Sequence, residues 1–181
     1  MDFLNHTIIK GITSQDSKNF NINLLECNNV TFEGVKIVTA PGSVNTDGIH
    51  MGRSRCITIT DSKLECGDDC ISIGDGTENV TISKVKCGPG HGISIGSLGR
   101  YTKEAPVIGV HISDCTLSQT TNGVRIKSWP GEHVNSVDDI VFEGITMDNV
   151  SNPIILDQGY CPWNQCKKGV IKTLLLHIIY S

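Results

Sequence analysis

Two series of short apolar segments alternate along the chain at a nearly regular interval. In both series apolar residues alternate with polar ones, and β-branched residues are frequent. The first series steps by 27, 22, 22, 31 and 30 residues, at Ile22, Ile49, Ile71, Ile93, Val124 and Ile154. The second steps by 27, 23, 30 and 30 residues, at Val30, Ile57, Val80, Val110 and Ile140. Two segment series that share one period of this size indicate a solenoid, in which each repeat adds one coil.

The repeated segments have the pattern of strands. Alternation with period two and β-branched residues is typical of strands, whereas helical repeats need apolar stripes with a period of 3.6 residues. The Leu-x-x-Leu-x-Leu pattern of leucine-rich repeats is absent, and 19 glycines against 6 prolines agree with a turn-rich β protein. We therefore predict an all-β chain, a right-handed parallel β-helix that forms a single domain over residues 1–181. Its coils would stack about 4.8 Å apart around a continuous apolar core.

Composition excludes several classes of protein. With 38% hydrophobic and 19% charged residues, the chain is too apolar for a disordered protein. Its net charge of −4 disfavours nucleic-acid binding, which needs a basic face. The sequence has no apolar run near the ~20 residues that a membrane-spanning helix requires. We expect a monomer that binds neither nucleic acid nor a membrane.

Cysteine content indicates an oxidising compartment. Eight cysteines form an even and generous set, and four Asn-x-Ser/Thr sequons, at Asn5, Asn29, Asn79 and Asn149, agree with secretion. Small buried apolar residues are the alternative for Cys27, Cys56 and Cys115. No pair of cysteines has the C-x2-C spacing of a zinc site, so we expect no metal.

Polar residues recur at one register position of the first series. Two residues before the apolar position lie Asp47, Asp69 and His91 in three successive repeats. The intervening Gly48 and Gly92 permit a bend, so the polar side chains can project to one outer face. A bend before Asp68 would bring its carboxylate to the same side. If these repeats stack in register, their side chains form one cluster.

Two cations occupy the next repeat. Arg125 and Lys127 flank Ile126, so they point outward if Ile126 points into the core. Carboxylates about 5 Å apart cannot all ionise freely, and one pKa should rise. A neutral carboxyl beside ionised ones is the arrangement of glycoside hydrolysis, and the cations would bind an anionic substrate. Taken singly, each group is an ordinary turn or surface residue, and only the shared register favours catalysis.

Four motifs that carry these residues resemble a known family. They match, in order, the motifs of the polygalacturonases, glycoside hydrolase family 28, and the stretches around them resemble plant members, with Gly99-Arg100-Tyr101 similar to the pollen-type exopolygalacturonases. The resemblance extends from about residue 16 to about residue 169. The motifs are Asn45-Thr46-Asp47, Gly67-Asp68-Asp69, Gly90-His91-Gly92 and Arg125-Ile126-Lys127.

The resemblance implies a secreted, extracellular or cell-wall enzyme with a pectin lyase-like right-handed β-helix. Such an enzyme hydrolyses α-1,4-galacturonosyl linkages of pectin (polygalacturonic acid) with inversion, and it needs no cofactor or metal. By motif position, Asp68 is the general acid, and Asp47 and Asp69 activate water. His91 would hydrogen-bond near the acid and support its protonation. Endo and exo action both remain open, because loops at the ends of the cleft decide between them.

Further roles follow from the same resemblance. Arg125 and Lys127 would hold the substrate carboxylate beside the scissile bond, and Asn45 and Tyr160 would contact substrate. For Tyr160, ordinary packing is the alternative. A disulfide between Cys70 and Cys87 would brace the loop between the acid and the histidine, and Cys161 and Cys166 are expected to close a small loop. Cys66 replaces the small residue that usually precedes the Gly-Asp-Asp motif.

The ends of the chain depart from the family. Family members are longer at both ends, and Asp2 and Asn5 interrupt any signal peptide after Met1. We therefore expect a β-helix that begins in mid-solenoid, is incomplete at its ends and has an atypical tail over residues 170–181. The alternative function is a catalytically inactive, truncated β-helix that binds pectin or has only a structural role in the cell wall. A calcium-dependent pectate lyase is disfavoured, because the three aspartates match the hydrolases.

Overall fold

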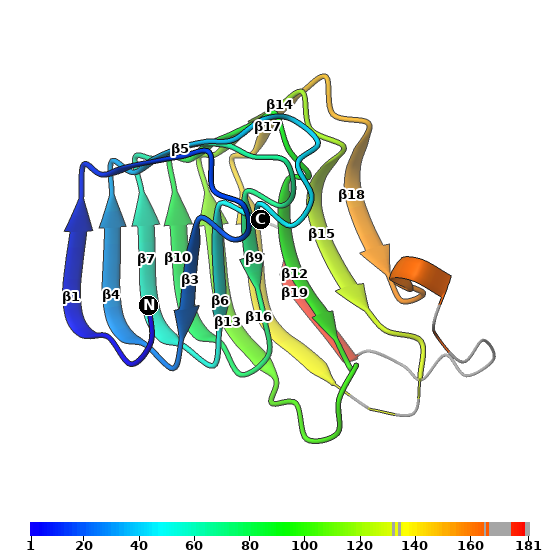
Figure 1. Ribbon diagram of the computed structural model, residues 1–181. Helices are drawn as coiled ribbons and strands as arrows, with labels where there is room; N and C mark the ends of the chain where they lie inside the picture. The colour runs from blue at the N-terminus through cyan, green and yellow to red at the C-terminus, as the bar shows by residue number, and fades with distance from the viewer. Residues whose placement is uncertain (132, 134, 165, 167–174, 180–181) are drawn as a thin grey trace.

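The computed structural model describes residues 1–131, 133, 135–164, 166 and 175–179. Its strands form three parallel sheets, and successive coils lie side by side along one axis (Figure 1). The prediction of an all-β parallel β-helix is confirmed. The one helix among the described residues, the 3-10 helix η1 (Pro162–Asn164), is a single turn. No helix in the described part of the chain has the length and hydropathy to cross a membrane.

Six coils each contribute one strand to each of the three sheets, which we call sheets I, II and III, and β19 adds a seventh strand to sheet I. Sheet I contains β1 (Asn5–Lys10), β4 (Asn28–Glu33), β7 (Arg55–Thr60), β10 (Glu78–Ser83), β13 (Val107–Ser113), β16 (Ser136–Glu143) and β19 (Leu175–Ile179). Sheet II contains β2 (Thr13–Gln15), β5 (Lys36–Val38), β8 (Lys63–Glu65), β11 (Lys86–Cys87), β14 (Thr116–Ser118) and β17 (Thr146–Asp148). Sheet III contains β3 (Ile22–Leu25), β6 (Ile49–Gly52), β9 (Ile71–Ile73), β12 (Ile93–Leu98), β15 (Asn122–Ser128) and β18 (Asn152–Asp157).

The two sequence series are two columns of stacked residues. Every step of the first series is a register pair in sheet III, from Ile22 with Ile49 to Val124 with Ile154. Every step of the second series is a register pair in sheet I, from Val30 with Ile57 to Val110 with Ile140. The repeat therefore predicted the pairing of these strands residue by residue.

Sheet II was not predicted, because its strands are only two or three residues long. Its central apolar residue nevertheless follows the second series at a fixed offset of seven residues, as in Val30 to Ile37 and Ile57 to Leu64. The chain turns between sheets I and II at a residue with positive φ, which is 64° at Gly34. This corner has the same length in every described coil, so it forms a rigid edge of the solenoid.

The interior of the coils is filled by the apolar faces of all three sheets. Phe32, Ile59 and Ile82 form one fully buried column in sheet I, and Ile49 and Ile71 begin another in sheet III. Burial of each such side chain contributes about 1.5–3 kcal/mol relative to exposure. A single coil cannot bury its apolar face alone, so this stabilisation depends on the stacking of neighbouring coils.

Three of the four cysteines without a disulfide are buried, and the fourth is exposed. Cys27, Cys66 and Cys115 are buried thiols, which agrees with the alternative of small apolar residues for Cys27 and Cys115. Cys56 is exposed, so that alternative is wrong for it.

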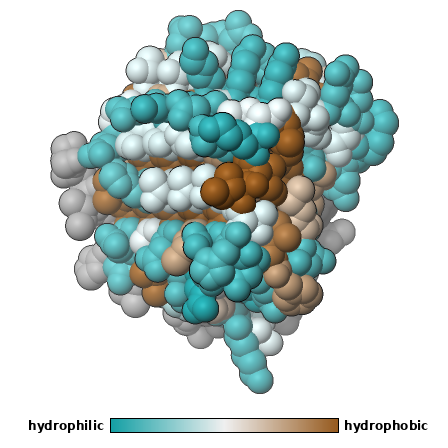
Figure 2. Space-filling view, turned by 90° about the vertical axis from the view of Figure 1, so that its left-hand side faces the viewer, coloured by the Kyte–Doolittle hydropathy of each residue, from teal (hydrophilic) through white to brown (hydrophobic). Residues whose placement is uncertain are grey.

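The two ends of the stack expose apolar side chains. The end formed by β1 shows a brown apolar strip among hydrophilic side chains (Figure 2), and Phe3 and Ile8 are 68% and 73% exposed there. At the other end Ile154 in β18 is 62% exposed. Residues 175–179 lie in the segment that was predicted to be an atypical tail. They continue sheet I as β19, in parallel pairing with β16.

Candidate active site

Segments longer than the basic coil lie beside sheet III. Between sheets II and III, Ile49 follows Ile37 by twelve positions, whereas Ile71 follows Leu64 by seven. Between sheets III and I, Val110 follows Ile93 by seventeen positions. Because the corner between sheets I and II is constant, all the additional residues lie at the ends of the sheet III strands. The predicted polar residues lie on the outer face of this sheet.

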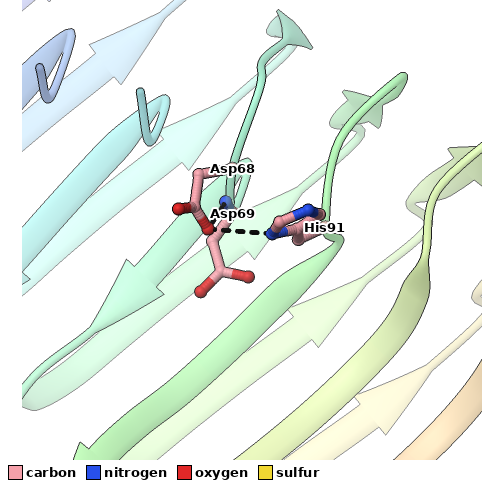
Figure 3. Close-up of side chains that lie close together, drawn as sticks. All are labelled: Asp68, Asp69 and His91. Atoms are coloured by element: carbon pink, nitrogen blue, oxygen red, sulfur yellow. Dashed lines mark hydrogen bonds and ion pairs between the residues drawn. The ribbon is translucent and has the colours of Figure 1, made fainter. Parts of the chain in front are cut away.

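Asp68, Asp69 and His91 come together where strands β9 and β12 begin (Figure 3). The Nδ1–H of His91 donates to Oδ1 of Asp68 over 3.0 Å. The same oxygen accepts the backbone N–H of Asp69 at 2.9 Å. The backbone N–H of His91 donates to the carbonyl oxygen of Asp68 at 2.8 Å, which fixes the two loops against each other.

Asp69 is enclosed by two cations from β15. Arg125 Nη2 lies 2.9 Å from Oδ1 of Asp69, and Lys127 Nζ lies 2.7 Å from Oδ2. The Ser94 hydroxyl donates to Oδ1 at 2.9 Å and accepts from Nε of Arg125 at 3.1 Å. Asp69 is 1% exposed, so the two cations compensate a buried carboxylate. The expectation that Arg125 and Lys127 face outward is met, but in this structure their partner is Asp69.

Asp47 lies beside Asp69 and is held by a different group. The Ser72 hydroxyl donates to Oδ2 of Asp47 at 2.6 Å, and Nδ1 of His50 lies 2.8 Å from the same hydroxyl. Since Ser72 has one proton, its hydroxyl accepts from His50 when it donates to an ionised Asp47. The ring of Phe20 stacks on His50 with centroids 4.7 Å apart, which fixes the imidazole.

The aspartates differ in their affinity for a proton. Burial raises the pKa of Asp47 to about 7, against the opposing hydrogen bond from Ser72, and the charges of Asp69 and Asp68 add to the rise. Burial also favours the neutral form of Asp68, but the hydrogen bond and charge of His91 outweigh it, so the pKa of Asp68 lies below its usual value. The hydrogen bond to Asp68 raises the pKa of His91.

One carboxyl, that of Asp47, therefore has a raised pKa. Burial is the main cause, and the neighbouring carboxylates, from which the rise was predicted, contribute less. His91 favours the ionised form of Asp68, which is opposite to the support for protonation expected from the motif.

A buried threonine ties the two aspartate-bearing loops together. The backbone N–H of Gly67 donates to Oγ1 of Thr46 at 3.1 Å, and Thr46 donates to the carbonyl oxygen of Ser43 at 2.8 Å. A Cβ on Gly67 would lie 2.3 Å from that same carbonyl oxygen, so only glycine allows this approach. The loops with Asp47 and Asp68 are thus packed with their backbones in contact.

The structure contains both disulfides that the sequence suggested. Cys70 is joined to Cys87, and Cys161 is joined to Cys166. The first connects the strand after Asp69 to the segment before His91. Cys66 is buried next to the site, and burial together with the nearby carboxylates raises the pKa of its thiol to about 12.

Tyr160 and Asn45 are the two other residues that were expected to contact substrate. The Tyr160 ring lies 5.0 Å from Nζ of Lys127 and 6.0 Å from the guanidinium of Arg125. Asn45 is exposed in the long segment between β5 and β6, with a φ of 56°. Tyr160 therefore contacts the cations of the site, whereas Asn45 is an exposed residue two positions before Asp47.

Three positions were not singled out from the sequence. Ser72 and Ser94 occupy one outward column of sheet III with His50 and Arg125, and they orient the carboxylates. Thr46 is buried and joins the loop that carries Asp47 to the loop that carries Asp68 by hydrogen bonds. The register identifies the two serines, because each follows the aligned isoleucine by one residue.

Asp68, Asp69 and His91 are also the one group of described residues whose ligand atoms, within 4.8 Å of one another, could hold a metal ion. Both oxygens of Asp69 already contact cationic nitrogens, from Arg125 and Lys127. These positive charges oppose a divalent cation at the same oxygens. The arrangement is better suited to proton transfer than to metal binding.

Comparison with known proteins agrees with this geometry. The chain is 59% identical to a polygalacturonase of Gossypium hirsutum over 168 residues. The aligned region is 93% of this chain and 41% of the relative. It is 57% identical to an exopolygalacturonase of Platanus acerifolia over 168 residues, 92% of this chain and 44% of the relative. The chain thus spans about two fifths of the length of these curated relatives.

Solved structures show the same architecture. A polygalacturonase from Erwinia carotovora ssp. carotovora superposes with a TM-score of 0.80 at 31% identity, over 88% of this chain and 42% of that one. Endopolygalacturonase I from Stereum purpureum, complexed with two galacturonate, superposes with a TM-score of 0.79 at 26% identity, over 88% and 48%. The family model of glycosyl hydrolases family 28 matches residues 1–179, beyond the stretch of 16–169 on which the motif resemblance rested. The chain belongs to glycosyl hydrolases family 28.

Proposed function

We propose that the protein containing this chain is an extracellular polygalacturonase that hydrolyses α-1,4-galacturonosyl linkages of pectin with inversion. The observation that carries the proposal is the cluster on sheet III, where Asp47, Asp68 and Asp69 lie with His91. Burial raises the pKa of Asp47 there, whereas His91 lowers that of Asp68. An acid and a base in different environments are what inverting glycoside hydrolysis requires. The relatives named polygalacturonase and exopolygalacturonase support the substrate class.

In this mechanism Asp68 gives its proton to the leaving glycosidic oxygen. The side chain of Asp68 is 25% exposed, whereas that of Asp69 is 1% exposed, so Asp68 can reach a bound polymer. Asp47 and Asp69 orient the attacking water and accept its proton. Ser72 and Ser94 hold these two carboxylates in place, because each donates a hydrogen bond to one of them.

These roles need Asp68 protonated and Asp47 ionised. The pKa directions favour the opposite arrangement, because the pKa of Asp47 is raised and that of Asp68 is lowered. A bell-shaped rate profile reports the two macroscopic pKa values and does not say which residue carries which. Substitution of single aspartates therefore has to assign the roles.

The decisive variant is Asp68→Asn, assayed by release of reducing ends from polygalacturonic acid. Loss of a general acid lowers the rate by about 10²- to 10⁴-fold. Asp148→Asn, which changes an exposed carboxylate in β17, is the matched control and should keep the wild-type rate. A wild-type rate in Asp68→Asn would remove Asp68 from the acid role. Tight binding of polygalacturonate by the wild-type protein without any product would favour a pectin-binding protein instead.

A further inference from the structure

Three consecutive coils place a cation and two aromatic rings in a row at the carboxyl ends of the sheet III strands. The Arg100 guanidinium, after β12, lies 4.8 Å from the ring centroid of Trp129, after β15. The Trp129 ring meets the Tyr160 ring, after β18, edge to face at 6.2 Å. Tyr101 adds a third ring, with its centroid 5.2 Å from Arg100.

This row is continuous with the catalytic cluster. Tyr160 contacts Lys127 at 5.0 Å, and Lys127 lies 2.7 Å from Asp69. Arg100 and Trp129 therefore extend the same wall away from the carboxylates. A polymer that lies across Asp69 and Tyr160 would reach them with another of its sugars.

Backbone contacts hold the row in position. Glu104 accepts the backbone N–H groups of Gly99 and Tyr101, on both sides of Arg100, and it also accepts from the Asn135 side chain at 3.1 Å. The backbone N–H of Trp129 donates to the carbonyl oxygen of Leu98 at 2.8 Å. Arg100 is thus presented by a structured loop even though its side chain is exposed.

The balance of charge distinguishes Arg100 from the other cations of the site. Arg125 and Lys127 share the buried carboxylate of Asp69, so their charge is compensated within the protein. Arg100 is exposed, and in the described part of the chain no carboxylate forms an ion pair with it. A guanidinium that lies on an aromatic face keeps its N–H edge free for a planar, bidentate carboxylate.

We propose that Arg100 and Trp129 form a second anion subsite, which binds the carboxylate and ring face of a uronate other than the sugar at the scissile bond. The proposal rests on the proposed function for its substrate class and goes beyond it in naming a subsite. Trp129 and Tyr101 add apolar surface beside Arg100 against which the sugar ring can pack, and Arg100 selects an unesterified carboxylate over its neutral methyl ester.

Calorimetric titration with tri-galacturonate tests the subsite in the folded chain. Arg100→Gln should weaken binding about tenfold or more, because a charge-assisted hydrogen bond contributes about 1.5–3 kcal/mol. The affinity of Arg100→Gln for the fully methyl-esterified trimer should stay within about twofold of wild type, since that ligand lacks the carboxylate charges. Lys103→Gln removes an exposed cation from the same loop and should leave both affinities within about twofold of wild type. Arg100→Lys should give an intermediate loss.

Each result separates this subsite from the proposed activity. Equal affinity of wild type and Arg100→Gln for tri-galacturonate, or no binding by wild type, overturns the subsite. Equal weakening for the methyl ester also overturns it, because the loss would then not depend on charge. If wild type hydrolyses polygalacturonate while Arg100→Gln binds normally, the hydrolase stands and the subsite fails. If binding depends on Arg100 but no product forms, the subsite stands and the hydrolase fails.

Discussion

Asp47→Asn should stabilise the protein at neutral and alkaline pH while it removes a group of the proposed mechanism. Asp47 is 7% exposed, and its carboxyl has a pKa of about 7 instead of 3.8 because burial penalises the charge. Ionisation above that pKa is therefore a cost that the folded protein carries. Asparagine has nearly the same shape, keeps an oxygen that can accept from Ser72 and cannot ionise.

The sign and size follow from proton linkage. Below pH 3.8 both the folded and the unfolded chain hold the proton on Asp47, so this group has no effect on the free energy of unfolding. Between 3.8 and about 7 the unfolded chain releases the proton and the folded chain keeps it, so stability falls as pH rises. At 1.36 kcal/mol per pH unit the full loss is about 4 kcal/mol. A new amide N–H₂ without an acceptor would offset about 1 kcal/mol of the gain.

Urea unfolding of wild type and Asp47→Asn at about pH 3 and about pH 8 measures this effect. The two proteins should be nearly equal at the lower pH, and the variant should be more stable by about 2–4 kcal/mol at the higher one. Asp68 and His91 titrate in both proteins, so the difference isolates Asp47. Asp148→Asn should change stability by less than about 0.5 kcal/mol at either pH. A difference that does not grow with pH would refute the view that burial raises the pKa of Asp47.

Two further substitutions test the supports of the site. Lys127→Met leaves the buried Asp69 with one cation. It should reduce the free energy of unfolding at about pH 7 by about 3–5 kcal/mol. A loss below about 1 kcal/mol would contradict the buried ion pair. Gly67→Ala places a Cβ 2.3 Å from the carbonyl oxygen of Ser43 and should cost more than about 2 kcal/mol in urea unfolding. Gly52→Ala is its control and should cost less than about 1 kcal/mol, because its Cβ would have no neighbour within 4 Å.

The stacking register could be read from the sequence because strand pairing in a solenoid is set by period alone. Ile71 and Ile93 lie in consecutive coils 22 residues apart, and the structure pairs them directly. Sheet II escaped detection because two or three residues cannot show alternation. Its signal is the constant distance from the second series, as between Val80 and Cys87, which becomes visible only once that series is aligned.

The register predicted which residues form the cluster on sheet III, but it did not predict which of their side chains contact one another. Alignment placed Asp69 near Asp47, whereas the partners of Asp69 depend on the rotamers of long side chains. Lys127 reaches it across 58 residues of sequence, and no spacing rule gives that contact. The raised pKa belongs to Asp47 because that carboxyl is buried, whereas His91 lowers the pKa of Asp68, so its location required the coordinates.

The invariable two-residue corner between sheets I and II separates the scaffold from its specificity elements. Insertions occur only where the chain enters or leaves sheet III, as between Ile93 and Val110, which lie seventeen positions apart. A transplanted loop of different length at 99–106 should leave the core columns unchanged and alter only which polymers are accepted. A single-residue deletion inside a sheet I strand, by contrast, would exchange interior and exterior side chains along the rest of that strand. Engineering of substrate preference in this solenoid can therefore be confined to one flank.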